Sequence, residues 1–179
     1  IYASSTTPDV TISGNQISGS FTKTGASGIF YCYYNLGSPT AGTETITNNN
    51  FSNLTTTGTG ATNGIYSNTA VGQNRVCHSN TISNWTTGST STSYGMYCLS
   101  ALSNQVYNNS ISGISCSGSG GLIGLYFTGT NPVVYGNTIS GLTSATATTM
   151  YGIQCAGTAT VNLYGNKVYG LTNNNSAST

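Results

Sequence analysis

The sequence predicts an all-β protein, a right-handed parallel β-helix (β-solenoid) of about six coils that are 28–34 residues long. Three observations carry this prediction. A nine-residue kernel, apolar-x-x-Asn-x-apolar-x-Gly/Asn-apolar, recurs along the chain, and its last copy runs from Leu163 to Leu171. Apolar residues within each copy alternate with the period of two that is typical of strands. The copies are centred on asparagines that are 34, 31, 29, 28 and 29 residues apart, namely Asn15, Asn49, Asn80, Asn109, Asn137 and Asn166.

A second kernel lies between these copies and consists of a glycine, a large apolar residue and usually an aromatic one. It occurs as Gly28-Ile29-Phe30, Gly64-Ile65-Tyr66, Gly95-Met96-Tyr97, Gly124-Leu125-Tyr126 and Gly152-Ile153-Gln154. About thirty residues per repeat hold two or three short strands and tight bends, but not the four strands of a propeller blade, so a parallel β-helix fits best. Connections between parallel strands are right-handed in nearly all cases, which gives the expected hand.

In chain order, residues 1–9 complete a coil and residues 10–36 hold the first full pair of kernels. The turn-rich segment 37–42 is an insertion that explains the longest step. Each later coil carries a variable tract of Thr, Ser and Gly before its second kernel, and these tracts are expected to stack as one loop face. The chain starts and stops in nearly the same repeat phase without atypical capping segments. Residues 1–179 are therefore interpreted as one repeat array, a segment of a longer chain or a stacking unit.

The kernels predict four inward columns of side chains, stacked at about 4.8 Å per coil. The first copy departs from the frame only at Ser20 in its last place. The expected columns are Ile12/Ile46/Cys77/Val106/Val134/Leu163, Ile17/Phe51/Ile82/Ile111/Ile139/Val168, Leu54/Trp85/Ile114/Leu142/Leu171 and Ile1/Ile29/Ile65/Met96/Leu125/Ile153.

Two further columns hold only residues that tolerate positive φ and should form the bends between strands. They are Gly14/Asn48/Ser79/Asn108/Gly136/Gly165 and Gly19/Asn53/Asn84/Gly113/Gly141/Gly170. The central asparagines of the first kernel are expected to form a ladder in which each amide bonds to the coils above and below.

The composition excludes several classes of function. The chain has three basic and two acidic side chains, far below the quarter of charged residues in ordinary globular proteins. No run approaches the roughly 20 apolar residues of a transmembrane helix. No block of charge suggests nucleic-acid binding. An uncharged surface of Ser, Thr, Asn and Gly does little to keep copies apart, so self-association, end to end or lateral, is the expected partnership.

These repeats resemble the right-handed parallel β-helix repeats of secreted bacterial proteins, and most closely the N-x-I-S-G-L / Y-G-I repeats of large secreted and cell-surface proteins of gliding-type bacteria. The resemblance covers essentially the whole chain. It implies an extracellular protein, secreted or attached to the cell surface. It specifies the fold strongly and the function weakly, because β-helices serve as enzymes, adhesins and fibres alike.

Polysaccharide lyases and hydrolases are the enzymes that this resemblance suggests, but the residues for that chemistry are missing. Glycoside hydrolysis normally uses two carboxylates about 5–10 Å apart. The two acids, Asp9 and Glu44, fall in neighbouring coils, and Asp9 follows Pro8 in a turn where Asp is common for structural reasons. A calcium-dependent lyase site needs more carboxylates than these. We therefore expect no enzyme, no catalytic residue and no cofactor.

The other residues that often bind metals also give no site. His78 is the single histidine and falls in an outward column with Tyr107, Tyr135 and Tyr164, so no metal centre is expected. The odd number of cysteines leaves at least one unpaired. Cys98 and Cys155 share an inward column two coils apart, too far for a disulfide, and are expected to be buried thiols. Cys116, in a variable tract, is expected to be the exposed one.

Outward aromatic residues are the main candidate surface. One predicted stripe contains Tyr2, Phe30, Tyr66, Tyr97 and Tyr126, and a second contains Tyr107, Tyr135 and Tyr164. Stacked cross-strand tyrosines stabilise a sheet by roughly 0.2–1 kcal/mol per pair. A whole stripe also suits contact with sugars or with another copy. Ice binding by a regular threonine array is disfavoured, because the threonines lie mainly in the variable tracts.

Two functional hypotheses follow. The first is an extracellular, non-catalytic structural protein that forms or decorates a surface fibre, sheath or adhesin. The alternative is a carbohydrate-binding β-helix module that uses the tyrosine stripes to bind a polysaccharide.

Overall fold

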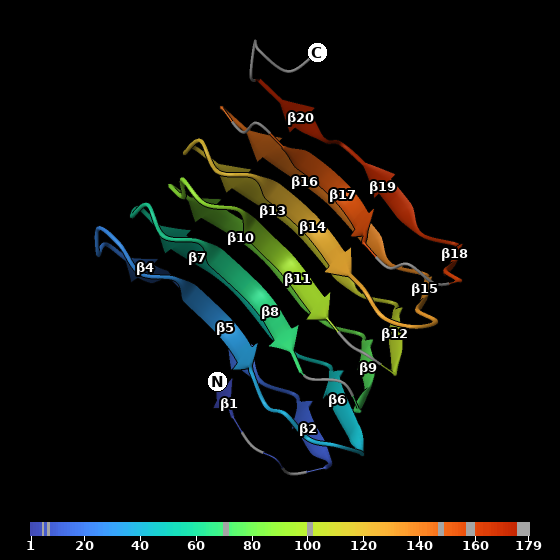
Figure 1. Cartoon of the computed structure of the whole chain (residues 1–179). Coiled ribbons are helices and arrows are strands. Elements are labelled where there is room, and N and C mark those ends of the chain that lie inside the picture. The colour runs from blue at the N-terminus through green and yellow to red at the C-terminus, as the bar shows by residue number, and fades with distance from the viewer. Residues whose placement is uncertain are drawn as a thin grey trace.

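The computed structural model describes residues 1–4, 6, 8–69, 72–99, 102–146, 149–156 and 160–174. Every regular element in these segments is a strand, and none of them forms a helix. The strands build three parallel sheets that wind into a solenoid of about six coils (Figure 1). The prediction of an all-β parallel solenoid is therefore confirmed.

Each central coil contributes one strand to each of three sheets, called here sheets A, B and C, and the first and last coils contribute two short strands each to sheet C. Sheet A contains β1 (Tyr2–Ala3), β5 (Phe30–Asn35), β8 (Thr62–Asn68), β11 (Ser93–Leu99), β14 (Leu122–Phe127) and β17 (Met150–Cys155). Sheet B contains β2 (Val10–Ser13), β6 (Thr43–Thr47), β9 (Asn74–His78), β12 (Ser103–Tyr107), β15 (Val133–Tyr135) and β18 (Asn162–Tyr164). Sheet C contains β3 (Gln16–Ile17), β4 (Phe21–Lys23), β7 (Asn50–Thr56), β10 (Thr81–Thr87), β13 (Ser110–Cys116), β16 (Thr138–Ser144), β19 (Lys167–Tyr169) and β20 (Thr172–Asn173).

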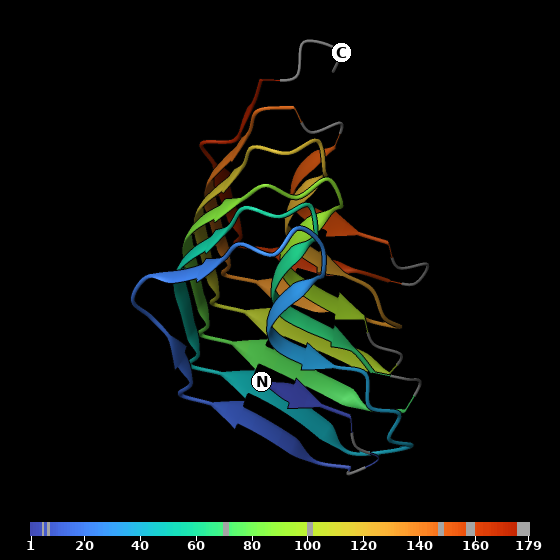
Figure 2. The same cartoon turned by 90° about the vertical axis from the view of Figure 1, so that its left-hand side faces the viewer.

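The chain visits sheets A, B and C in turn, so each strand pairs with its counterparts one coil earlier and one coil later. The strands β1 and β20 lie at opposite ends of the stack (Figure 1). The turned view in Figure 2 shows the sheets as separate walls around a common interior. Because neighbouring strands are always parallel and in register, the same frame position of every coil lies in one column.

The predicted core columns are the interior of the solenoid. In sheet B, Ile46, Cys77 and Val106 are in register, and all three are fully buried. In sheet C, Phe51 is in register with Ile82, which pairs in turn with Ile111. Trp85 is also buried, and its indole N–H donates to the carbonyl of Phe51 at 3.0 Å. Stacked identical positions therefore bury almost every inward apolar side chain of the central coils.

The glycine of the second kernel lies where the side chains of sheet C approach the backbone of sheet A too closely for a Cβ atom. A Cβ on Gly124 would lie 2.6 Å from the Cγ2 of Ile139, and one on Gly95 would lie 2.8 Å from the Cγ2 of Ile111. Sheet A therefore needs a column of glycines where the isoleucine column of sheet C approaches it. This contact fixes the width of the solenoid between these two sheets.

Both predicted bend columns have left-handed backbone conformations in every coil. The first has φ between 52° and 67°, and the second has φ between 57° and 89°. Asn or Ser fills both positions in the second and third coils, Asn108 fills the first position in the fourth coil, and Gly fills the others. The shared property of these residues is tolerance of positive φ, which is what the sequence pattern indicated.

The six kernel asparagines form an unbroken ladder along one corner of the solenoid. In each of the five steps, the side-chain Nδ2 of one asparagine donates to the Oδ1 of the asparagine in the next coil at 2.9 Å. The backbone N–H of the same residue donates to the same Oδ1 at 3.0–3.1 Å. Nδ2 also donates backwards, as from Asn109 to the carbonyl of Cys77 at 3.0 Å. The ladder therefore satisfies backbone groups that the corner would otherwise leave unpaired.

The first coil departs from the prediction at three places. Tyr33 is the residue in register with Ile65, so it takes the core place predicted for Ile29, which is 54% exposed. Tyr34 in turn is in register with Tyr66, in the place predicted for Phe30. Phe21 rather than Ser20 is in register with Leu54.

These differences have one physical cause. The first coil carries extra residues between its sheet C bend and β5, so the true kernel begins after Gly28-Ile29-Phe30. That tripeptide imitates the kernel, but Gly28 has φ 106° in a connecting segment. Phe30 stacks on Phe21 with ring centroids 4.8 Å apart, away from the tyrosine column.

We expect replacement of a central ladder residue to be costly. Asn109→Ala removes the side-chain acceptor of the Asn80 backbone N–H and the side-chain donor to the carbonyl of Cys77, whereas Asn80 Nδ2 keeps the carbonyl of Ile46 as an acceptor. Two buried groups that lose a partner at about 1–3 kcal/mol each should lower the unfolding free energy by roughly 2–6 kcal/mol in urea titrations followed by circular dichroism. Asn166→Ala at the partly exposed end is the matched control and should cost less. Equal stability of Asn109→Ala and wild type would contradict a structural role for the ladder.

Candidate functional site

The outer face of sheet A carries a continuous stripe of tyrosines, called here the sheet A stripe: Tyr2, Tyr34, Tyr66, Tyr97 and Tyr126. Consecutive ring centroids are 4.3–5.6 Å apart. Tyr31 and Tyr94 flank the stripe and pack their rings against it. Phe30, which was expected in this stripe, is not part of it.

A second stripe runs along the outer face of sheet B, called here the sheet B stripe: His78, Tyr107, Tyr135 and Tyr164. The rings are almost parallel, with interplanar angles of 4–6° and centroids 4.7–5.0 Å apart. His78 Nδ1 lies 3.2 Å from Thr47 Oγ1, one coil earlier. The histidine is therefore one member of an aromatic stack.

The stacking decides which parts of these rings a ligand can reach. Tyr97 lies between Tyr66 and Tyr126 at interplanar angles of 10° and 7°, so both of its faces are covered. Tyr135 is covered on both faces by Tyr107 and Tyr164 in the same way. Tyr97 and Tyr135 therefore present edges and hydroxyls to solvent, whereas a sugar that stacks on an aromatic residue needs a ring face.

Two phenols in and beside the sheet A stripe have raised pKa values. Burial, together with the neighbouring phenols Tyr34 and Tyr66, raises the pKa of Tyr31 to about 12. Burial and the adjacent Tyr66 raise the pKa of Tyr97 as well. The hydroxyl groups of Tyr31 and Tyr97 are therefore uncharged at neutral pH.

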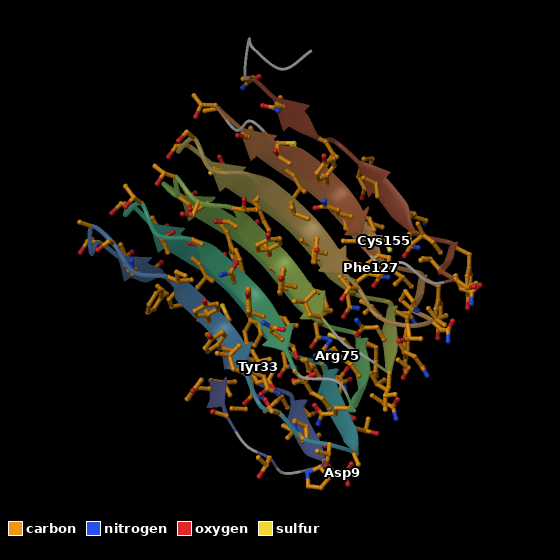
Figure 3. The ribbon with its side chains drawn as sticks, in the orientation of Figure 1. Asp9, Tyr33, Arg75, Phe127 and Cys155 are labelled. Atoms are coloured by element: carbon orange, nitrogen blue, oxygen red, sulfur yellow. The ribbon has the colours of Figure 1, made fainter. Side chains whose placement is uncertain are left out.

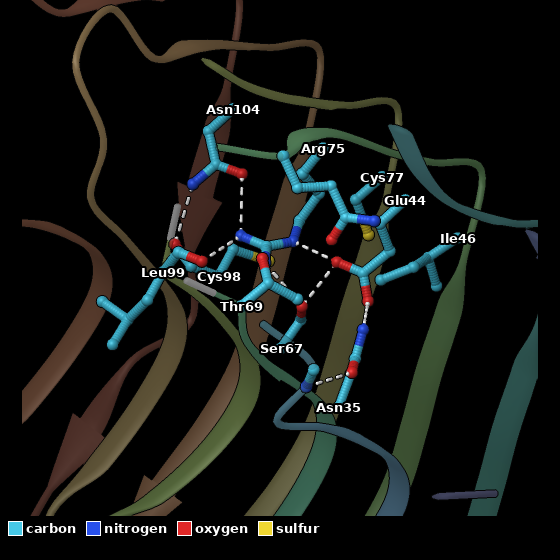
Figure 4. A network of polar contacts seen from close by, with 12 residues as sticks. Asn35, Glu44, Ile46, Ser67, Thr69, Arg75, Cys77, Cys98, Leu99 and Asn104 are labelled. Carbon is cyan, nitrogen blue, oxygen red and sulfur yellow. Dashed lines mark hydrogen bonds and ion pairs between the residues drawn. The ribbon is translucent and has the colours of Figure 1, made fainter. Parts of the chain in front are cut away.

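A polar cluster that was not predicted lies inside the solenoid, between sheets A and B (Figure 4). Glu44 and Arg75 form an ion pair with Nε and Oε2 2.7 Å apart, and both side chains are completely buried. Two further donors bind the other carboxylate oxygen, since the Tyr33 hydroxyl and Asn35 Nδ2 each lie 2.7 Å from Glu44 Oε1.

The guanidinium of Arg75 uses its remaining donors within the same cluster. Nη2 donates to the Thr69 and Ser67 hydroxyls, the former at 2.7 Å. Nη1 donates to the carbonyl of Leu99 and, at 3.2 Å, to Asn104 Oδ1. The cluster therefore draws side chains from four successive coils into one hydrogen-bonded unit.

Burial alone would raise the pKa of Glu44, but the cluster reverses this effect. The charge of Arg75 and the hydrogen bonds from Asn35, Ser67 and Tyr33 together hold the pKa of this carboxyl below its usual value. Glu44 is therefore ionised and fully engaged in structure.

The sequence contained a signal for this cluster. Glu44, Arg75 and Asn104 are in register with one another, five residues before their ladder asparagines. Each also precedes an inward core residue by two positions, and the strand period of two places it inside. The sequence prediction applied the inward–outward alternation of strands to apolar residues only. It therefore did not identify Glu44 and Arg75 as interior residues.

The two carboxylates, Asp9 and Glu44, lie in different environments. Asp9 is exposed, and its Oδ1 accepts a hydrogen bond from the backbone N–H of Thr43 at 2.9 Å. It lies at the N-terminal edge of sheet B, whereas Arg75 and its partner Glu44 face the interior (Figure 3). Asp9 and Glu44 therefore do not form a pair of accessible carboxylates that could flank a reactive bond.

Two expectations for the cysteines were wrong. Cys116 is buried, because β13 continues past its bend and points the side chain inward, 3.6 Å from the carbonyl of Gly118. Cys155 is exposed, because β17 is the last strand of sheet A and nothing in the described chain covers its column. Cys98, Phe127 and Cys155 do share that column (Figure 3 labels the last two). All five cysteines lie in described segments, and none forms a disulfide.

The hydroxyl groups of sheet C also differ from expectation. Threonines and serines occupy fixed outward columns, of which the most regular is Thr22/Thr55/Thr86/Ser115/Thr143/Thr172. A second column contains Ser52, Ser83, Ser112 and Ser140. The first position of each variable tract is therefore a fixed place in the coil, although an ordered hydroxyl face identifies no ligand by itself.

Within the described segments, no group of three or more His, Cys, Asp or Glu side chains is placed to hold a metal ion. The same segments contain no helix of the length and hydropathy needed to cross a bilayer. No protein-family model, curated protein or solved structure matches this chain.

The buried ion pair predicts a specific loss of stability in acid. Because the pKa of Glu44 is lowered by folding, its contribution is complete above the unfolded value of about 4.3 and is lost as the pH falls through the lower folded value. Glu44→Gln leaves Arg75 buried without its counterion and should reduce the unfolding free energy by about 3–5 kcal/mol at pH 7. Its stability should also depend less on pH in acid than that of wild type.

The measurement is urea unfolding at a series of pH values. Asp9→Asn is the control, because Asp9 is exposed, and it should keep both the neutral stability and the acid limb of wild type. An acid limb that persists unchanged in Glu44→Gln would show that another group controls it.

Proposed function

We propose that this chain is an extracellular, non-catalytic structural protein that forms or decorates a surface fibre, sheath or adhesin. The observation that carries the proposal is the uniformity of the coils. The three sheets, the bend columns and the asparagine ladder continue unchanged from one end of the described chain to the other. A solenoid of this kind is a rod whose length is set by the number of coils.

The placement of the charged side chains supports a structural role. Glu44 and Arg75 form the ion pair of the interior cluster, and Asp9 accepts a hydrogen bond from a backbone N–H of the next coil. Lys23 lies in β4, at the N-terminal edge of sheet C, and donates to the carbonyl of Gly25 at 3.4 Å. These groups stabilise coils, and none of them converges with another on an open cleft.

The extracellular location rests on the resemblance to secreted repeat proteins and on the composition of the surface. Outward columns of Ser, Thr, Asn and Tyr carry little charge. Such a surface favours association with like surfaces over steering of charged ligands.

A carbohydrate-binding module is the alternative, favoured by the two long rows of tyrosine hydroxyls. The covered ring faces weigh against it, because sugars that stack on aromatic residues need exposed faces. Hydrogen bonds from a row of phenols remain available to a polysaccharide that lies along the solenoid axis.

The structural proposal predicts long rods in native material. Antibodies against this chain should label filaments in electron micrographs, and the filaments should diffract with an axial spacing of about 4.8 Å, the distance between coils. Label confined to short discrete particles, without the coil spacing, would argue against a fibre.

Titration with polysaccharides separates the alternative from the main proposal. Isothermal calorimetry of wild type with neutral and acidic polysaccharides should show no saturable binding. Saturable binding that is lost in Tyr135→Ala and kept in Thr86→Ala, on the outer face of sheet C, would instead establish the sheet B stripe as a sugar site.

A further inference from the structure

The outer face of sheet C carries a regular array of short polar side chains in the central coils, called here the hydroxyl face. It is formed by β7, β10, β13 and β16, which are consecutive strands of this sheet (Figure 1). Two residues of each strand point outward on either side of a fully buried core residue, such as Ile82 in β10. In β19 the two columns continue as Lys167 and Tyr169, so the face ends at β16. Its members are Asn50/Thr81/Ser110/Thr138 in one column and Ser52/Ser83/Ser112/Ser140 in the next.

The positions of these side chains are fixed in two directions. Neighbours within a column are separated by the coil spacing of about 4.8 Å, and the two columns lie about 6.6 Å apart because they are two residues apart along each strand. Each of the four strands pairs on both sides, and the buried residue between the two outward positions anchors them to the core. The hydroxyl face is therefore a rigid two-dimensional lattice of polar groups.

The fold does not use the polar groups of this lattice. Among the described residues, none of its side-chain hydroxyls makes a hydrogen bond to another protein group, and Asn50 Oδ1 has no hydrogen-bond partner. Inward hydroxyls of the same strands differ, since Thr56 Oγ1 lies 3.1 Å from Thr87 Oγ1 and 2.6 Å from Thr62 Oγ1. The outward groups are therefore available to a ligand outside the chain.

The chemistry of the hydroxyl face limits what can bind to it. None of its eight residues is charged or aromatic, so the face offers neither an ion pair nor a ring on which a sugar could stack. A hydroxyl group both donates and accepts hydrogen bonds, as a water molecule does. A ligand that engages the whole lattice must itself repeat at matching intervals in two directions. The oxygen atoms in the surface of an ice crystal repeat at comparable intervals.

We propose that the hydroxyl face binds ice, with its hydroxyl oxygens taking the places of water molecules in the outermost layer of the crystal. This activity goes beyond the proposed structural role and does not depend on it. The face belongs to the first kernel, in which Thr81-Ile82-Ser83 and Thr138-Ile139-Ser140 place a hydroxyl on each side of an inward isoleucine. The threonines of the variable tracts, which argued against ice binding in the sequence, are not part of it.

Partition into slowly growing ice tests the proposal. Ice that grows slowly on a cooled probe excludes ordinary proteins, so wild type should be enriched in the ice relative to serum albumin in the same solution. Ser112→Lys places a strongly hydrated ammonium group inside the lattice and should reduce this enrichment severalfold. Gln105→Lys is the matched control, because Gln105 is exposed on the outer face of sheet B and receives the same charge. It should keep the enrichment of wild type.

Two results of this experiment would overturn the proposal. The first is exclusion of wild type from the ice as complete as that of albumin. The second is equal enrichment of Ser112→Lys and Gln105→Lys, each shown to be folded by circular dichroism, because the effect would then not depend on sheet C.

A neutral variant separates the fit of the lattice from the effect of charge. Ser112→Leu removes a hydroxyl and raises a bulkier side chain above its neighbours without adding charge. Crystal grains in a thin frozen film should therefore coarsen faster with Ser112→Leu than with wild type, whereas Gln105→Leu should match wild type. Equal coarsening with the two leucine variants would count against the lattice.

The hydroxyl face and the structural function can fail separately. Labelled filaments from a protein that ice excludes would refute the ice-binding face and leave the fibre in place. Enrichment in ice that is lost in Ser112→Lys, together with an absence of filaments, would refute the fibre and leave the ice-binding face.

Discussion

The distance of about 4.8 Å between successive coils is the constraint on which the rest of this structure depends. At that spacing, each side chain lies directly over the side chain at the same position of the next coil. The residue type at each position must therefore pack well against residues of its own kind. Aliphatic residues do so in the core, asparagine does so in a corner, and parallel tyrosine rings do so on the surface. The repeat in the sequence is the direct consequence.

The buried cluster of Glu44 and Arg75 is the exception to this rule. It makes two coils different from the others, which are otherwise nearly equivalent. Glu44 and Arg75 occupy the same frame position in adjacent coils, where two like charges would repel and two opposite charges attract. A slip by one coil would place Glu44 or Arg75 against a residue that cannot neutralise it. We interpret the pair as a device that fixes register, a role for which buried polar groups are best attested.

Regularity also explains what was predictable from the sequence. Bends at Asn53 and Gly113 and the ladder through Asn80 follow from spacing alone, because each residue type has one property that suits its column. The first coil was misassigned because Gly28-Ile29-Phe30 has the composition of a kernel, and only strand pairing shows that Tyr33 fills the core. The strand period places Glu44 and Arg75 in the interior, but the side chains that complete their cluster come from four coils and do not follow from that spacing. The stacking that covers the tyrosine faces depends on the orientation of the rings, which the alignment of residue types in a column does not specify.

The polarity of the ladder connects this architecture to its use. Three sheets of parallel strands already give the rod a direction, and the asparagines add donors at one end and acceptors at the other. Because few charges remain on the surface, association between copies meets little electrostatic resistance. Shape and hydrogen bonding, more than charge, are then left to select what binds to the faces of the rod.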